Sequence, residues 1–191
     1  MSTGRLEAFT DGVVAIIITI MVLDMKVPAG SDVKALAADA PVFLGYVLSY
    51  VNVGIFWNNH HHMLQAAEHV DGRALWANLF LLFWISMVPF GIRWVDESHD
   101  AALPTAAYGV ILAMCSVGYT LLQQALIACN GADSGLARAV GNDLKGKLSL
   151  AFYLAAIPLA FVSPLIAIVI YVGVALSWFI PDRRIETRLK A

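Results

Sequence analysis

The chain has 191 residues and a formal net charge of −2, and 60% of its residues are apolar while only 14% are charged. Soluble domains average roughly 45–50% apolar and about 25% charged residues, so this composition and a mean hydropathy of +0.74 exclude an ordinary soluble domain. No basic cluster suggests a nucleic acid partner. We expect one membrane domain over residues 1–191, embedded in the lipid bilayer.

The first apolar run extends from Leu6 to Leu23. Wound as a helix at about 100° per residue, it places four side chains on one arc of about 100°: Ile16, Thr19, Ile20 and Leu23. Thr10 and Asp11 point to the other side. An ionisable residue in a membrane helix is by default functional or holds helices together. We therefore expect one face of this helix to line a narrow apolar pore and the other to bind neighbouring helices.

Five further apolar segments follow, each close to the length of about 20 residues that a membrane span needs. With the first run, the six expected spans cover residues 6–26, 41–64, 74–95, 103–129, 147–162 and 164–181. Pro158 interrupts the fifth span and Ser163-Pro164 makes the turn into the sixth, which predicts a short, kinked hairpin. The link 27–40 predicts a short amphipathic connection, and 130–146 is the longest polar segment. The predicted fold is all-α.

The basic residues predict the orientation of these spans, because cytoplasmic loops carry an excess of lysine and arginine. With the N-terminus inside, nine of the twelve basic residues fall on the cytoplasmic side. The three on the outer side are Lys26, Lys34 and Arg93. We therefore expect a multi-pass protein of the cell membrane with both termini in the cytoplasm.

The second span offers polar partners for Asp11 and Thr10. Four of its side chains could reach the first helix: Trp57, Asn58, His61 and His62. Trp57 and His61 lie four residues apart on one face, and Asn58 and His62 lie on the next. We expect a polar corner that locks the two helices together, not an acid–base catalyst. The alternative is that Asp11 is a solvated cap near the headgroups.

Other patterns resemble a metal site or a carbonyl filter, but their positions on the helices do not support either. Adjacent histidines on a helix point about 100° apart, so the run His60-His61-His62 cannot converge on one metal ion. Val117-Gly118-Tyr119 echoes a carbonyl potassium filter, but it lies inside an apolar helix. Gly109 and Gly118, like the pairs Gly45–Ser49 and Gly173–Ser177, predict close helix packing. We find no catalytic motif, so we expect no enzyme, no metal and no cofactor.

The opening of the first helix resembles a known family. Its signature residues are Arg5, Phe9, Thr10, Asp11 and Gly12. They are similar to the RxxxFSDG motif of the transmembrane-protein-175 family of endolysosomal potassium channels and their prokaryotic homologues, with threonine in place of serine. The run from Trp57 to His61-His62 is similar to the second-helix pattern of that family, and six spans without a repeat resemble its prokaryotic branch.

This resemblance implies a homotetramer in which the first helix of each subunit surrounds a central pore. Potassium ions would pass apolar constrictions at Ile16, Ile20 and Leu23, with Thr19 as the nearby hydroxyl. The expected function is a passive, potassium-preferring cation channel. Two alternatives stay open: a small secondary transporter whose Asp11–His61 corner carries protons, and a scaffold without flux.

Overall fold

In the computed structural model, the protein is described over residues 3–23, 25, 27–99 and 101–179. Within these ranges the secondary structure is helical, which confirms the all-α prediction. The helices are α1 (Thr3–Leu23), α2 (Val33–Ala38), α3 (Ala40–Gln65), α4 (Gly72–Ser86), α5 (Val88–Glu97), α6 (Ala102–Asn130), α7 (Gly135–Val140), α8 (Leu144–Leu159) and α9 (Pro164–Trp178).

Among the described residues, four helical segments are long and apolar enough to cross a membrane: α1, α3, the α4–α5 segment from Gly72 to Glu97, and α6. A shorter apolar helix, α9, has 15 residues and α8 has 16. Both are shorter than the length of about 20 residues that a straight span needs. The ends of the first and last expected spans at residues 24, 26 and 180–181 lie outside the described residues.

The single span expected over residues 74–95 consists of two helices that meet at Met87. Pro89 explains the break, because proline has no N–H to donate to a carbonyl four residues earlier. It occupies the first turn of α5, where that missing donor has no partner to lose. The same property places Pro164 at the start of α9, after the expected turn at Ser163. Pro158 lies in the last turn of α8, which ends at Leu159, before the expected residue 162.

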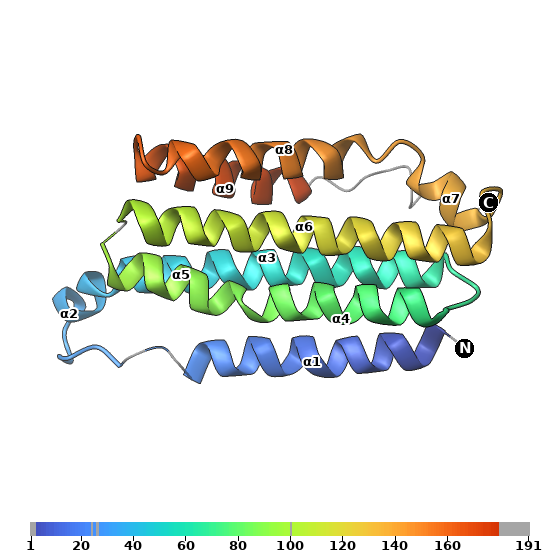
Figure 1. Cartoon of the computed structure of the whole chain (residues 1–191). Coiled ribbons are helices and arrows are strands. Elements are labelled where there is room, and N and C mark those ends of the chain that lie inside the picture. The colour runs from blue at the N-terminus through green and yellow to red at the C-terminus, as the bar shows by residue number, and fades with distance from the viewer. Residues whose placement is uncertain (1–2, 24, 26, 100, 180–191) are drawn as a thin grey trace.

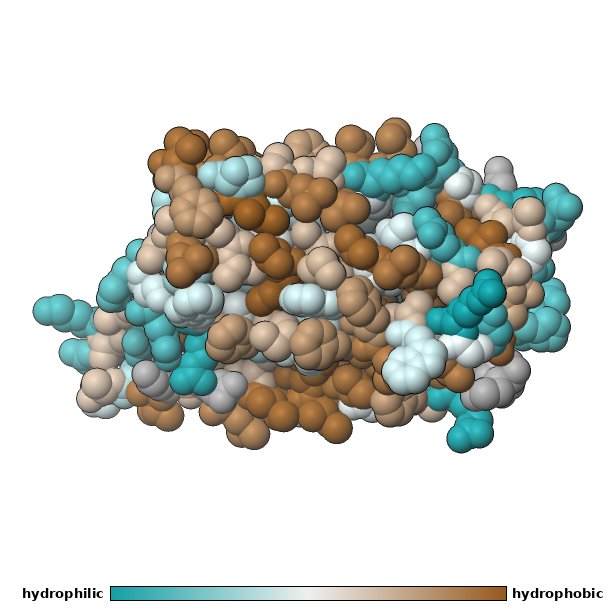
Figure 2. All heavy atoms as spheres, in the orientation of Figure 1, coloured by the Kyte–Doolittle hydropathy of each residue, from teal (hydrophilic) through white to brown (hydrophobic). Residues whose placement is uncertain are grey.

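The long helices run side by side as an elongated bundle (Figure 1). In this view α1 forms one edge, α3 to α6 lie in the middle, and the α8–α9 pair forms the opposite edge. The chain's N-terminal end and α7 lie at the same end of the bundle, while α2 lies at the other. Hydrophobic side chains cover the middle of the visible face, and hydrophilic side chains gather toward its two ends (Figure 2). That distribution suits a bilayer with water on both sides.

Close helix contacts occur at three of the glycines expected to provide them: Gly45, Gly109 and Gly118. A Cβ atom on Gly45 would meet the carboxylate of Asp96 on α5. A Cβ atom on Gly118 would lie 2.9 Å from the Cα atom of Leu81, so α6 approaches the backbone of α4 there. A Cβ atom on Gly109 would meet the hydroxyl of Tyr171, which donates a hydrogen bond of 3.1 Å to the Thr105 carbonyl. The expectation for Gly173 was wrong, because a Cβ atom there would have no atom within 4 Å.

Candidate pore helix and its polar attachment

One face of α1 packs against α3 and α4. Its buried residues follow each other at intervals of three or four: Leu6, Thr10, Val14, Ile17 and Met21. This spacing is the repeat of a helix stripe that faces its neighbours. The stripe is apolar except at Thr10, so any hydrogen-bonding partner for that hydroxyl must come from an adjacent helix.

The opposite face of α1 is not covered by the described part of the subunit. The exposed fractions are 59% for Ile16, 51% for Ile20 and 80% for Leu23, against 8% for Ile17. Thr19 is exposed on the same side, and its Oγ1 donates to the carbonyls of Ala15 and Ile16, at 3.0 Å each. The hydroxyl proton is thus engaged with the helix, which leaves the Oγ1 lone pairs available as acceptors.

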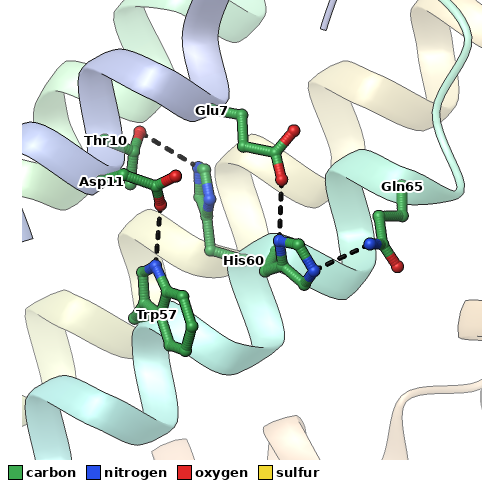
Figure 3. A network of polar contacts seen from close by, with 7 residues as sticks. Glu7, Thr10, Asp11, Trp57, His60 and Gln65 are labelled. Atoms are coloured by element: carbon green, nitrogen blue, oxygen red, sulfur yellow. Dashed lines mark hydrogen bonds and ion pairs between the residues drawn. The ribbon is translucent and has the colours of Figure 1, made fainter. Parts of the chain in front are cut away.

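Asp11 is held by the second expected span. Nε1 of Trp57 on α3 donates a hydrogen bond of 2.7 Å to Oδ1 of Asp11 (Figure 3). A hydrogen bond to a carboxylate is shorter and stronger than one between neutral groups. The indole ring also stacks on His61, with the ring centroids 5.9 Å apart. Trp57 therefore connects the carboxylate of α1 to the polar end of α3.

Thr10 forms a second, buried attachment. Nδ2 of Asn78 on α4 donates to Thr10 Oγ1 at 3.0 Å, and Asn78 Oδ1 lies 2.8 Å from His60 Nε2. The Thr10 hydroxyl also lies 3.5 Å from His60 Nε2 (Figure 3). All three side chains are at most 2% exposed. One polar cluster therefore joins α1, α3 and α4 inside the apolar interior, where an unpaired polar group is costly.

A third attachment lies one turn closer to the start of α1. Glu7 Oε1 is 2.7 Å from His61 Nδ1, and His61 Nε2 is 2.7 Å from Gln65 Nε2 (Figure 3). Glu7 and His61 are about 30% exposed, so they lie at the border of the apolar region. The direct Asp11–His61 contact that a proton-transfer corner would use is therefore not formed: His61 binds Glu7, and Asp11 binds Trp57.

The sequence reading missed two members of this site, His60 and Asn78. His60 lies on the buried arc of α3 with Ser49, Asn52 and Val53, and that periodicity was available in the sequence. Asn78 is a polar residue inside an apolar run, which by itself indicates a packing or functional role in a membrane helix. Asn58, in contrast, is exposed and lies outside these contacts.

The remaining residues of the opening motif lie away from the subunit core. Arg5, Phe9 and Gly12 are exposed, at spacings that place them on the same side of α1 as Ile16. Phe9 is 52% exposed, and a Cβ atom on Gly12 would have no atom within 4 Å. The motif thus divides between two tasks: Thr10 and Asp11 bind α3 and α4, and the other three residues add to the uncovered face.

The histidine run does not gather into one site. His60 turns to Asn78 inside the subunit, whereas His61 binds Glu7 and Gln65 near its surface. Among the described residues, no group of three or more histidine, cysteine, aspartate or glutamate side chains is arranged to hold a metal ion.

Comparison with known proteins relates this arrangement to an ion channel family. The sequence model of "Endosomal/lysosomal potassium channel TMEM175" matches residues 5–89. A potassium channel from Chryseobacterium sp. strain P1-3 is 50% identical over 190 residues, which cover 100% of this chain and 99% of that protein. The chain belongs to the TMEM175 family. Every residue of the polar attachment, from Glu7 to Asn78, lies within the part that the family model matches.

Two other members of the TMEM175 family show how far the likeness extends. The solved structure of a lysosomal potassium-selective channel TMEM175 homolog from Chamaesiphon minutus superposes with a TM-score of 0.80 at 26% identity, covering 92% of this chain and 95% of that one. The mouse endosomal/lysosomal proton channel TMEM175 is 41% identical over 116 residues, which are 52% of this chain and 23% of that protein. The likeness to the bacterial members therefore covers the whole bundle.

Proposed function

We propose that this protein is a passive, potassium-preferring cation channel formed by four copies of the chain. The observation that carries this proposal is the division of α1 into a bound and an uncovered face. A helix that only faced lipid would need neither a hydroxyl at Thr19 nor polar locks to two neighbours to fix its rotation. The 50% identity to a potassium channel over the whole chain supports the same function.

In the proposed tetramer the uncovered face of α1 lines the axis. One chain has a single α1, and a ring of equivalent helices requires several copies related by cyclic symmetry. Ile16, Ile20 and Leu23 then form successive apolar rings, with Thr19 between them. An apolar ring has no group to replace the water lost by an ion, so it favours the more weakly hydrated cation, potassium over sodium. The permeant ion is the only ligand that the pore needs.

We also propose six crossings, with both termini in the cytoplasm. The short helices α8 and α9 are joined by the turn around Ser163, and their packing against α6 supports a hairpin inside the bilayer. Five of the described basic residues belong to segments at the N-terminal end of the bundle: Arg5, Arg73, Arg138, Lys145 and Lys147. Two belong to segments toward the α2 end, Lys34 of α2 and Arg93 of α5. This asymmetry supports a cytoplasmic N-terminal end.

The deciding experiment is ion flux into liposomes that contain the purified protein. We expect potassium and rubidium to enter without a coupling ion, sodium to enter more slowly, and the current to change linearly with voltage near zero. Native mass spectrometry of the same preparation should give the mass of four chains. A monomer or dimer as the largest species, or flux that requires a proton gradient, would contradict the proposal.

The transporter alternative places proton transfer at Asp11 and His61. The side chain between them is the Trp57 indole, whose N–H is only a donor and cannot pass a proton onward. The channel is therefore the better-supported function. The test compares the wild-type protein with His61→Gln. If the protein is a channel, the reversal potential is independent of pH in both. A pH-dependent reversal potential that His61→Gln abolished would favour the transporter.

A further inference from the structure

A groove lies between α8 and α9, on the far side of the bundle from α1. Its volume is about 480 Å³, and its walls come from Lys145, Leu148 and Phe152 of α8 and from Val169, Gly173 and Ser177 of α9. Gly173 leaves the groove open, because a Cβ atom there would have no atom within 4 Å. Leu148, Phe152 and Val169 are 48%, 51% and 61% exposed. The groove is therefore mostly apolar and accessible from outside the subunit.

A positive charge stands at one end of this groove. Lys145 Nζ lies 4.5 Å from the centre of the Trp178 ring, a distance at which a cation is attracted to the ring face. The ring is itself fixed, because Trp178 Nε1 donates a hydrogen bond of 3.0 Å to Ser149 Oγ. Ser149 is buried. The ammonium group thus lies beside the groove, over an indole ring that is itself held by Ser149.

The groove extends along most of the thickness of one leaflet of a bilayer. Lys145 and Phe152 are seven residues apart, and Ser177 and Val169 are eight. At a rise of 1.5 Å per residue, the two walls are about 10 and 12 Å long. Half of the hydrocarbon core of a bilayer is about 15 Å thick. A chain that entered at Lys145 would reach close to the bilayer midplane.

The groove also has the right position for a lipid. Lys145 is the second residue of α8, and α8 begins on the side of α7, toward the end of the bundle that holds the N-terminal end of the chain (Figure 1). Two more basic residues, Arg138 and Lys147, belong to this end. If α1 faces the axis, a point that rests on the proposed function, then the α8–α9 edge is the part of the subunit farthest from the pore and faces the bilayer.

We propose that the α8–α9 groove binds a phospholipid with an anionic headgroup, taken from the leaflet on the N-terminal side. One acyl chain lies along Leu148, Phe152 and Val169 and passes over Gly173. The headgroup phosphate meets Lys145, with Ser177 at the same end. Charge complementarity selects the headgroup, because a basic residue near the membrane surface attracts an anionic lipid and gains little from a zwitterionic one of no net charge.

The experiment measures which lipids stay bound to the purified oligomer. Protein in mild detergent is incubated with equal amounts of phosphatidylglycerol and phosphatidylcholine of identical acyl chains, and native mass spectrometry counts the lipids retained per subunit. Two variants change the groove: Lys145→Gln removes the cation, and Gly173→Leu fills the open space. Two matched controls lie outside it: Lys147→Gln, two residues further along α8, and Ala151→Leu, about 100° around α8 from Phe152.

We expect the wild-type protein to retain phosphatidylglycerol in preference to phosphatidylcholine. Lys145→Gln should lower that preference about fivefold, the effect of one basic residue near the surface. Gly173→Leu should reduce retention of both lipids, and both controls should match the wild-type protein. The oligomer mass in the same spectra verifies assembly independently of ion flux, so a blank flux assay leaves the lipid result intact.

Three outcomes would overturn the assignment. Unchanged retention in Gly173→Leu would place the lipid elsewhere. Equal effects of Lys145→Gln and Lys147→Gln would mean a general attraction to basic residues at the surface. The lipid-free protein could also form a larger assembly that Gly173→Leu disrupts. That result would assign the groove to contact with a second copy of the protein.

Discussion

The indole of Trp57 on α3 binds the carboxylate of Asp11 on α1 through a hydrogen bond of 2.7 Å. Only one atom of each side chain takes part, Nε1 as donor and Oδ1 as acceptor. The bond joins the helix with the uncovered apolar face to the helix that carries the histidine run. It therefore fixes how far α1 is rotated, and with it which residues face away from the subunit.

This bond predicts different outcomes for two substitutions of Asp11. Asp11→Asn keeps an acceptor for the indole N–H, whereas Asp11→Ala removes it; because both side chains are exposed, the cost is that of one lost hydrogen bond, about 0.5–1.5 kcal/mol. We expect a low yield of assembled oligomer for Asp11→Ala and a milder loss for Asp11→Asn, measured by size-exclusion chromatography. Trp57→Phe, which keeps the ring and removes the donor, is the matched change on the partner. Normal yields for all three variants would mean that Asp11 is a solvated cap.

The buried cluster predicts a different pattern for Thr10. Thr10→Val has nearly the same shape but removes the hydroxyl, which leaves Asn78 and His60 with fewer partners in the apolar interior. The expected loss of stability is about 1–3 kcal/mol, seen as a lower thermal midpoint by circular dichroism. Thr10→Ser keeps the hydroxyl and should remain close to the wild-type midpoint. If Thr10→Ser fell as far as Thr10→Val, the methyl group and not the hydrogen bonds would hold the helices together.

The two faces of α1 give a paired test of the pore. Ile16 is 59% exposed on the uncovered face, and Ile17 is 8% exposed against the neighbouring helices. Ile16→Asn should wet an apolar ring, raise conductance and weaken the preference for potassium over sodium. Ile17→Asn buries an amide without a partner and should mainly reduce the amount of folded protein. Flux is compared at matched protein amounts. If flux rose in Ile17→Asn and not in Ile16→Asn, the assignment of the pore to the uncovered face would be wrong.

The glycines of the bundle predict opposite effects of one added methyl group. Gly118→Ala would bring Cβ to 2.9 Å from the Leu81 Cα atom, which forces α4 and α6 apart and costs about 1–3 kcal/mol. Gly173→Ala meets open space, and alanine in a helix interior is more stable than glycine by about 0.5–1 kcal/mol. Thermal midpoints of the two variants should therefore move in opposite directions. A lowered midpoint in both would show that Gly173 is also packed.

Sequence periodicity was enough to predict which residues of α1 share its uncovered face. The spacing of Ile16, Ile20 and Leu23 predicted a shared face, and these residues are exposed together in the structure. The bond between Asp11 and Trp57 was also within reach, because an acid inside a membrane helix needs a partner. The tetramer and the role of that face in conduction stay predictions.

The rest depended on which helices become neighbours, and a one-dimensional pattern does not contain that information. Asn78 is a partner of Thr10 because α4 lies beside α1, and the sequence does not reveal that neighbour. Of the histidines His60, His61 and His62, only His60 lies on the buried stripe of α3, whereas the predicted partner was His61. Gly173 looked like Gly118 in sequence, but the space beside a glycine is decided by the opposite helix.

The polar contacts of α1 with α3 and α4 lie at Glu7, Thr10 and Asp11, in the first half of the helix. Among the described residues, the second half is attached through apolar side chains, of which Val14, Ile17 and Met21 are buried. The half with the polar contacts thus acts as a pivot, and the half held by apolar packing acts as a lever arm. Leu23 lies twelve residues beyond Asp11, about 18 Å along the axis, so a tilt of about 10° at the pivot displaces Leu23 by about 3 Å.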